Sequence, residues 1–313
     1  MNQNTAGLSH RTKRAGNTPR PAKRNLRQGV QFCGYVLPAV IFIVTFVGIP
    51  FAMCIYYSFR KWNGIDKTSS FIGWDNYKKL FTNDLYFGDA IGYTFLYALM
   101  VVVLVNVLAI LFATLLESKI RGKGPLRAAF YIPNIISLVI IGFIWKFICT
   151  RVFEALGSTT GIPLFGLSWL GVPDLAVITT VIVSVWQGLG FYLIIYIAGM
   201  QSVPGELQEA ARIDGASAFR RFFSVTLPMI MPSISFCMFY SVANSMKMFE
   251  LIFSLTGGGP GSATTSIALD IYNTAFNNRQ FGYGSAKSVI LFLIVAVISV
   301  AQVSFFKSKE VEA

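Results

Sequence analysis

The chain is poor in charged side chains. Asp, Glu, Lys and Arg together make up only 13% of its 313 residues, whereas charged residues make up about a quarter of a typical soluble domain. Apolar residues make up 54%, and the mean hydropathy is +0.60. This composition excludes an ordinary soluble domain and predicts a protein that folds within a lipid bilayer.

Groups that commonly carry covalent or metal chemistry are scarce. The single histidine, His10, lies in a polar N-terminal segment, and the four cysteines have no short mutual spacing. Neither a disulfide framework nor a zinc site is therefore expected. A membrane-embedded enzyme would need a cluster of His, Cys or carboxylate side chains at one depth, and the sequence offers none. We expect no catalytic residue, no metal site, and packing roles for Cys33, Cys54, Cys149 and Cys237.

A phosphate-binding loop is also missing. Such a loop needs Gly-x-x-x-x-Gly-Lys-Ser/Thr, because its backbone N–H groups surround phosphate oxygens and its lysine contacts them. The two glycine-rich stretches, 257–263 and 282–288, do not contain glycine followed directly by lysine. The sequence therefore predicts no nucleotide site in this chain.

Long apolar runs are what the sequence has in abundance. A helix that crosses a hydrocarbon core of about 30 Å needs about 20 apolar residues. Six runs meet this length, which predicts an all-α polytopic membrane protein with six transmembrane helices. The runs are Cys33–Tyr57, Ala90–Leu116, Ala128–Ile148, Leu175–Met200, Ser224–Met246 and Ala286–Phe306.

Residues 1–30 form a basic tail before the first run. The tail is polar, contains proline and lacks apolar periodicity, so we expect it to be disordered. The first run is too long for the apolar region of a signal peptide and is expected to remain in the protein. The net charge of +12 might suggest nucleic acid, but the tail lacks interleaved aromatic residues and adjoins a span. We therefore expect it to contact anionic lipid and no nucleic acid. The transmembrane domain is predicted over 31–307, followed by a short cytoplasmic tail, 308–313.

Lys and Arg are unevenly divided between the two sides that six spans define. If the N-terminal tail is cytoplasmic, sixteen of the 26 Lys and Arg residues fall on cytoplasmic segments. Cytoplasmic loops carry the excess of basic residues. We therefore expect a multi-pass membrane protein with both termini in the cytoplasm.

The predicted cytoplasmic loop 201–223 has more order than a simple connection needs. Acidic residues and good helix formers follow Pro204, which predicts a short helix. Gly215 interrupts this helix, since glycine adopts positive φ at little cost. A second short helix through Phe219, Phe222 and Phe223 leads into the fifth span, whose start Pro228 and Pro232 should bend. The pattern favours a docking element, with an amphipathic segment lying on the bilayer as the alternative.

The same loop resembles a known signature. Glu209-Ala-Ala-Arg-Ile-Asp-Gly-Ala216, Phe222, Val225-Thr-Leu-Pro228 and Pro232 resemble the EAA signature of permease subunits in binding-protein-dependent ABC importers, with Val225 where isoleucine is usual. Other stretches are similar to the carbohydrate branch of that family, of the maltose and glycerol-phosphate type. They are Tyr35–Ala39, Phe71–Tyr77, Tyr131–Asn134, Leu255–Pro260 and Ile271–Phe276.

The resemblance implies a location in the plasma membrane of a bacterium or archaeon, and a division of labour among subunits. This chain would form half of a heterodimeric pathway for a sugar, with a second permease subunit, a cytoplasmic ABC ATPase dimer and an extracytoplasmic sugar-binding protein. ATP and Mg²⁺ would be bound by the ATPase, so this chain would bind no cofactor and would not be an enzyme. The signature residues expected to couple the chain to the ATPase are Glu209, Ala210, Ala211, Asp214, Gly215, Ala216, Leu227 and Pro228. Of these, the first three would face the ATPase, Asp214 would cap or hydrogen-bond locally, and Gly215 would form the bend.

Two groups of residues are candidates for the substrate pathway. Asn244, Lys247 and Glu250 follow at three-residue spacing, which would place them on one helix face at the outer end of the fifth span, near Tyr240 and Phe249. Polar groups and aromatic faces of this kind suit a sugar. The alternative is an i,i+3 ion pair between Lys247 and Glu250 that reaches the interface. The second group, in the fourth span, has helix packing as its alternative. It consists of Trp186, Gln187 and Tyr192.

A self-contained ion-coupled carrier is the alternative function. Such a carrier would need buried carboxylates or a proton relay deep within its spans. The sequence shows neither pattern. The sequence therefore favours the ATP-driven importer.

Overall fold

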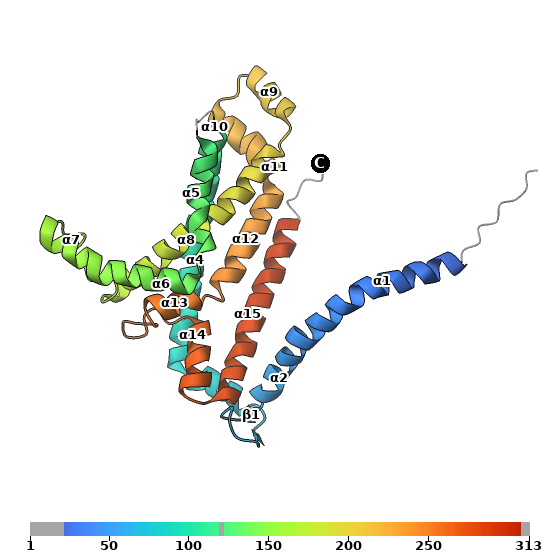
Figure 1. Ribbon diagram of the computed structural model, residues 1–313, viewed down its shortest axis with the longest axis vertical. Coiled ribbons are helices and arrows are strands. Elements are labelled where there is room, and N and C mark those ends of the chain that lie inside the picture. The colour runs from blue at the N-terminus through green and yellow to red at the C-terminus, as the bar shows by residue number, and fades with distance from the viewer. Residues whose placement is uncertain (1–21, 119–121, 308–313) are drawn as a thin grey trace, which may run out of the picture. The chain divides into compact units, whose positions relative to one another are not determined.

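The computed structural model describes residues 22–118 and 122–307, and these are almost entirely helical (Figure 1). Residues 1–53 and 54–313 form two units, each of which is described by itself. The predicted terminal segments 1–21 and 308–313, with Lys119 and Arg121, lie outside the described residues. The elements are α1 (Ala22–Ile43), η1 (Val44–Gly48), α2 (Ile49–Ser58), β1 (Arg60–Lys61), β2 (Ser70–Phe71), α3 (Asp75–Thr82), α4 (Leu85–Glu117), α5 (Lys123–Ile135), α6 (Leu138–Phe147), η2 (Ile148–Val152), α7 (Phe153–Thr160), α8 (Pro173–Gln201), α9 (Gly205–Ile213), α10 (Ala218–Arg221), η3 (Phe222–Thr226), α11 (Leu227–Met229), α12 (Met231–Ser245), α13 (Glu250–Leu255), α14 (Ile267–Tyr272), η4 (Asn273–Asn277) and α15 (Phe281–Lys307).

The first unit contains a correction to the sequence prediction. Because α1 begins at Ala22, residues 22–30 of the expected tail are helical instead of disordered. The segment contains Lys23, Arg24, Leu26 and Arg27, which are good helix formers and extend the apolar helix backwards. The apolar helix Gly34–Ser58 is long enough to cross a membrane.

Four helices of the described chain are long and apolar enough to cross a membrane, and there are six crossings if each of two bent pairs counts as one. The third predicted span is not straight, because a 95° bend separates α5 from α6. Ile136 and Ser137 are extended there, with ψ of 137° and 134°. The fifth span bends by 71° at Ile230, between Pro228 and Pro232, so the expected bend is confirmed. Proline removes a backbone donor and disrupts the preceding turn, which accounts for the bend.

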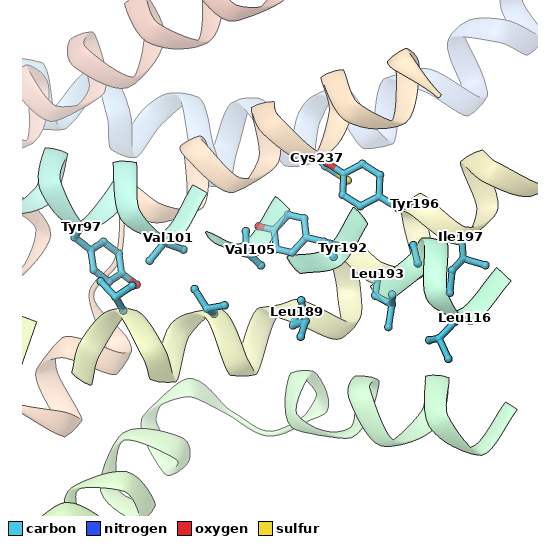
Figure 2. Packing of buried hydrophobic residues seen from close by; sticks show 14 of the residues in the cluster. Tyr97, Val101, Val105, Leu116, Leu189, Tyr192, Leu193, Tyr196, Ile197 and Cys237 are labelled. Carbon is cyan, nitrogen blue, oxygen red and sulfur yellow. The ribbon is translucent and has the colours of Figure 1, made fainter. Parts of the chain in front are cut away.

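The core of the second unit lies between α4, α8 and α12. Tyr97 and Val105 of α4, Leu193 and Tyr196 of α8, and Cys237 of α12 are buried in one cluster (Figure 2). The packing role expected for Cys237 is therefore confirmed, and Cys149 is also buried. Cys54 is half-buried, and its thiol lies 3.6 Å from the carbonyl oxygen of Ser285.

Polar side chains join α4 to α8 inside this core. The hydroxyls of Tyr93 and Thr180 are 3.0 Å apart, and those of Tyr97 and Ser184 are 2.6 Å apart. Further along the same two helices, the Tyr196 hydroxyl donates to Asn106 Oδ1 at 2.5 Å. Polar contacts of this kind hold helices together in lipid, where apolar burial gives no net drive for association. They fix the register of α4 against α8.

Glycine allows two other helix pairs to approach closely. A Cβ added at Gly190 of α8 would lie 2.2 Å from the carbonyl oxygen of Phe130 in α5. A Cβ added at Gly142 of α6 would lie 1.8 Å from Ser254 Oγ in α13. Small residues are common at such membrane helix contacts. Both contacts hold the bent pair α5–α6 against the core.

The end of the unit that carries β1 lies opposite the end that carries α9 (Figure 1). Strands β1 and β2 pair antiparallel. The buried Asn76 side chain of α3 donates to the carbonyl oxygens of Ser58 and Arg60, at 2.8 and 3.1 Å. Phe71 and Trp74 remain 72% and 63% exposed, and exposed aromatic rings are common at a membrane interface.

Candidate functional site: a protruding elbow and a polar cavity

The segment between α8 and α11, residues 202–226, forms an elbow at one end of the bundle (Figure 1). Its first helix, α9, has Glu206 in the first turn and Arg212 in the last, which suits the helix dipole. The Gly215 backbone has φ of +75°, as the sequence predicts for a bend. Asp214 is the C-cap, and its N–H donates to the Ala210 oxygen at 3.0 Å. The bend is thus closed by local backbone hydrogen bonds.

The elbow exposes both small and apolar side chains. Glu209 and Ala210 are exposed, whereas Ala211 and Ala216 are half-buried. Larger apolar groups are exposed beside them, with Ile213 at 86% and Phe219 at 75%. Exposed apolar side chains gathered on a protruding segment are typical of a protein contact.

Side-chain hydrogen bonds connect the elbow to the spans. The Gln208 amide donates to Thr226 Oγ1 at 2.9 Å, which ties α9 to η3. Arg221 donates to the Ala216 oxygen at 2.9 Å. Leu227 packs against the main core, and Pro228, which is exposed, follows it in α11. The elbow is therefore an ordered continuation of α8 and α12.

Glu117 holds the end of α8 next to the elbow. Its carboxylate accepts from Gln201 at 2.9 Å and from Arg127 at 2.7 Å. These bonds join the ends of α4, α5 and α8. The end of α8 that adjoins the elbow is therefore held to α4 and α5.

A cavity of about 600 Å³ lies within the bundle and collects six of the predicted pathway residues. Its walls come from α4, the α5–α6 break, α8, α12 and the start of α13. The predicted residues that line it are Gln187, Tyr192, Tyr240, Asn244, Lys247 and Glu250.

The predicted helix face that would carry Asn244, Lys247 and Glu250 does not exist. Helix α12 ends at Ser245, Lys247 lies in the following turn, and Glu250 begins α13. The turn nevertheless brings all three to one cavity. The ion pairs within 4.0 Å among the described residues do not include Lys247 with Glu250. Both charged groups therefore remain available to the cavity.

Residues 106–309 match the family of binding-protein-dependent transport system inner membrane components. The chain belongs to this family. The matched region contains the elbow and most of the cavity wall, so both features are parts of an inner membrane transport component.

Curated relatives of this transport component extend over nearly its whole length. It is 40% identical over 286 residues to the probable starch degradation products transport system permease protein AmyD of Thermoanaerobacterium thermosulfurigenes, covering 91% of this chain and 97% of that protein. It is 39% identical over 277 residues to the multiple sugar-binding transport system permease protein MsmF of Streptococcus mutans, covering 88% and 95%. A chain in the crystal structure of a bacterial ABC transporter that imports the acidic polysaccharide alginate has the same fold, with a TM-score of 0.78, 21% identity, and coverage of 91% and 98%.

Two predicted pathway residues of the transport component do not line the cavity. The Trp186 ring packs edge-on against Trp145, with ring centres 5.6 Å apart. The Phe249 ring packs against Phe253 and Tyr272, at 5.4 and 5.2 Å. Trp186 and Phe249 therefore pack against other aromatic side chains. For Trp186, helix packing is the alternative that the sequence left open.

The cavity also contains residues that sequence reasoning did not assign to it. Tyr131 and Asn134 reach it from the α5–α6 break, and Ser184 and Phe191 from α8. Phe191 lies 4.8 Å from the Tyr240 ring, measured between ring centres. Asn134 could have been predicted from the sequence, because it is an amide beside Pro133 within a largely apolar run. The complete lining offers amides, hydroxyls, one cation, one carboxylate and aromatic rings, which can hydrogen-bond a polyol and cover its apolar faces.

Proposed function

We propose that this protein is the transmembrane permease subunit of an ABC importer, forming half of a heterodimeric pathway for a sugar or oligosaccharide. The observation that carries the proposal is the continuity of α8, which contributes Gln187 and Tyr192 to the cavity and runs directly into the elbow. A push on the elbow therefore reaches the cavity through one helix. The relatives named for starch products and multiple sugars support a carbohydrate as the cargo.

The partners follow from this role. A second permease subunit completes the pathway, a cytoplasmic ABC ATPase dimer receives the elbow, and an extracytoplasmic sugar-binding protein delivers the sugar. ATP and Mg²⁺ bind to the ATPase, and this chain contributes no catalytic group. The elbow then lies in the cytoplasm with both termini, and the β1–β2 end lies outside. Family membership leaves no support for the ion-coupled carrier.

Reconstitution tests the proposal directly. We expect proteoliposomes that contain this chain, its sister permease and the ATPase to take up sugar only when the binding protein and ATP are supplied. Omitting the ATPase should abolish uptake. Sugar uptake driven by an ion gradient through this chain alone would contradict the proposal.

The cavity lining leads to a separate prediction about transport by variants of two neighbouring residues of α8, Gln187 and Trp186. Replacing Gln187 with leucine removes an amide from the cavity wall, and an unmade hydrogen bond to a bound polar group costs about 1–3 kcal/mol. We therefore expect Gln187→Leu to reduce the transport rate about tenfold at subsaturating sugar. Trp186→Phe, one residue away, should retain transport because Trp186 packs on Trp145. Equal rates for Gln187→Leu and the parent would remove Gln187 from the pathway.

A further inference from the structure

A buried charge cluster lies away from the cavity and the elbow. The Lys287 ammonium is 2.8 Å from Asp84 Oδ2 and 2.6 Å from Asp270 Oδ2. It also donates to Thr274 Oγ1 at 3.1 Å. Lys287 is 2% exposed, and the two carboxylate side chains are 10% and 12% exposed. The sequence does not reveal this cluster, because its charged members are 17 or more residues apart in the chain.

The cluster joins three helices at the end of the unit that carries α3. Asp84 is the N-cap of α4 and accepts from the Phe87 N–H at 2.9 Å. Lys287 lies in α15, and Asp270 lies in the six-residue helix α14. The ammonium therefore ties α14 to the ends of two long helices.

Helix α14 is also connected to the cavity. Its N-cap, Ser266, donates from Oγ to the carbonyl oxygen of Met248 at 2.7 Å, and Met248 lines the cavity. The Ile267 N–H donates to Thr94 Oγ1 at 3.0 Å. A shift of α14 would thus be transmitted to the cavity wall through one hydrogen bond.

The charges within the cluster do not balance. Two carboxylates share one ammonium, and buried charges need compensation because desolvation penalises them. Lys79 lines the hollow beside the cluster, but the ion pairs within 4.0 Å among the described residues do not join it to either carboxylate. Hydrogen bonds satisfy Asp84 further, since the Tyr283 hydroxyl donates to Asp84 Oδ2 at 2.6 Å. Burial would raise the pKa of Asp84, but its hydrogen bonds from Lys287, Tyr283 and Phe87 N–H lower that pKa overall. For Asp270, burial raises the pKa, and Lys287 offsets only part of this effect. Among the described contacts, the Asp270 carboxylate accepts a hydrogen bond from Lys287 alone, whereas Asp84 has three partners.

Space for Asp270 to move is present beside the cluster. A hollow of about 390 Å³ is lined by Asp84, Asp270 and Lys287. Ser262 and Thr265, from the loop that connects α13 to α14, line the same hollow. That loop has positive φ at four positions, which shows a succession of sharp turns. They are Gly257, Gly258, Gly261 and Ser262.

We propose that Lys287 is a positioning residue for transport, and that its contact with Asp270 is a releasable tie that holds α14, and through Ser266 the cavity wall, in one of two arrangements. The tie breaks and re-forms during each transport cycle while the Lys287–Asp84 pair persists. This inference rests on the proposed transport function for its role in the cycle, but the tie itself can be tested without sugar.

Hydrogen exchange measures release of the tie. In the complete importer in lipid nanodiscs, we expect the α14 amides to differ in exchange rate at least threefold between the nucleotide-free state and the vanadate-trapped ATPase state. Asp270→Asn leaves a balanced Lys287–Asp84 pair, so the protein should fold. It should exchange its α14 amides about tenfold faster than the parent in the nucleotide-free state. The matched control, Asp75→Asn, removes a carboxylate that lies 3.9 Å from Lys78 in an exposed pair, and should leave α14 unchanged. Identical α14 exchange in both nucleotide states would overturn the proposal.

A second variant separates release from simple stabilisation. The triple change Asp84→Asn, Asp270→Asn and Lys287→Met replaces the charges by neutral groups, which for buried ion clusters is often neutral or stabilising. We expect the assembled complex to melt at or above the parent temperature and to transport at least tenfold more slowly, since the contact that sets the two arrangements of α14 is absent. Parent-like transport would overturn the proposal. If the triple variant does not assemble, the exchange experiment with Asp270→Asn decides. Loss of ATP-driven sugar uptake by the parent itself would instead refute the proposed function, and would leave the exchange result standing.

Discussion

Replacing Gly215 with isoleucine is expected to uncouple ATP hydrolysis from transport. The backbone of Gly215 has φ of +75°, and nothing lies within 4 Å of a Cβ added there. The cost of isoleucine is therefore conformational, about 1–3 kcal/mol for a β-branched residue held in this region. Relief of that strain would straighten the bend after α9. We expect the complex to assemble and hydrolyse ATP while sugar transport falls at least tenfold, measured in the same proteoliposomes.

Two controls isolate the backbone angle from the added side chain. Asparagine tolerates positive φ better than other non-glycine residues, so Gly215→Asn should keep most of the transport rate. Gly205→Ile adds the same bulk at a position of the elbow that is also open but has no positive φ. It should transport like the parent. Parent-like coupling in Gly215→Ile would remove the bend from the mechanism.

Replacing Gly190 with valine is expected to have the larger effect on the folded bundle. A Cβ at this position would lie 2.2 Å from the Phe130 oxygen and 2.6 Å from Tyr131 Cα. These are backbone atoms, so α5 must move away from α8. Tyr131 lines the cavity, and its displacement would change the shape of the cavity. We expect the yield of assembled complex and the transport rate each to fall at least tenfold, measured by size-exclusion chromatography and uptake.

The control for Gly190 is a glycine of α4. A Cβ at Gly92 would meet nothing within 4 Å, and alanine is favoured over glycine within helices by about 1 kcal/mol. Gly92→Ala should therefore assemble and transport at least as well as the parent. A Gly190→Val complex of normal yield and activity would show that the α5–α8 contact is not needed.

The sequence predicted the spans and the elbow because both depend on local pattern. Apolar length determines the spans, and Pro228 and Gly215 act on their own neighbours. The 95° bend at Ile136 was not predicted. Pro133, Asn134 and Ser137 interrupt the apolar run near the break, but the direction of the chain after the break is set by the close contacts of α5 with α8 and of α6 with α13.

The candidate cavity was predicted only in part for the same reason. Gln187 and Asn244 stand out as amides within apolar runs, so composition alone marks them. The sequence could not show that Trp186 and Phe249 lie outside the cavity, because the direction of each side chain depends on partners that are distant in the sequence. These partners include Trp145 and Tyr272. Lys287 was missed because its two carboxylate partners lie in segments far from it in sequence.

The hydroxyl pairs between α4 and α8 limit how the protein can move. Tyr93 and Tyr97 are one turn apart, and so are their partners Thr180 and Ser184. Sliding by less than about 5.4 Å, one helical pitch, would break both bonds together where no water replaces them. The two helices must therefore travel as a single rod, and bending is left to the breaks at Ile136 and Ile230. A displacement of α8 beside the elbow would therefore carry α4 with it.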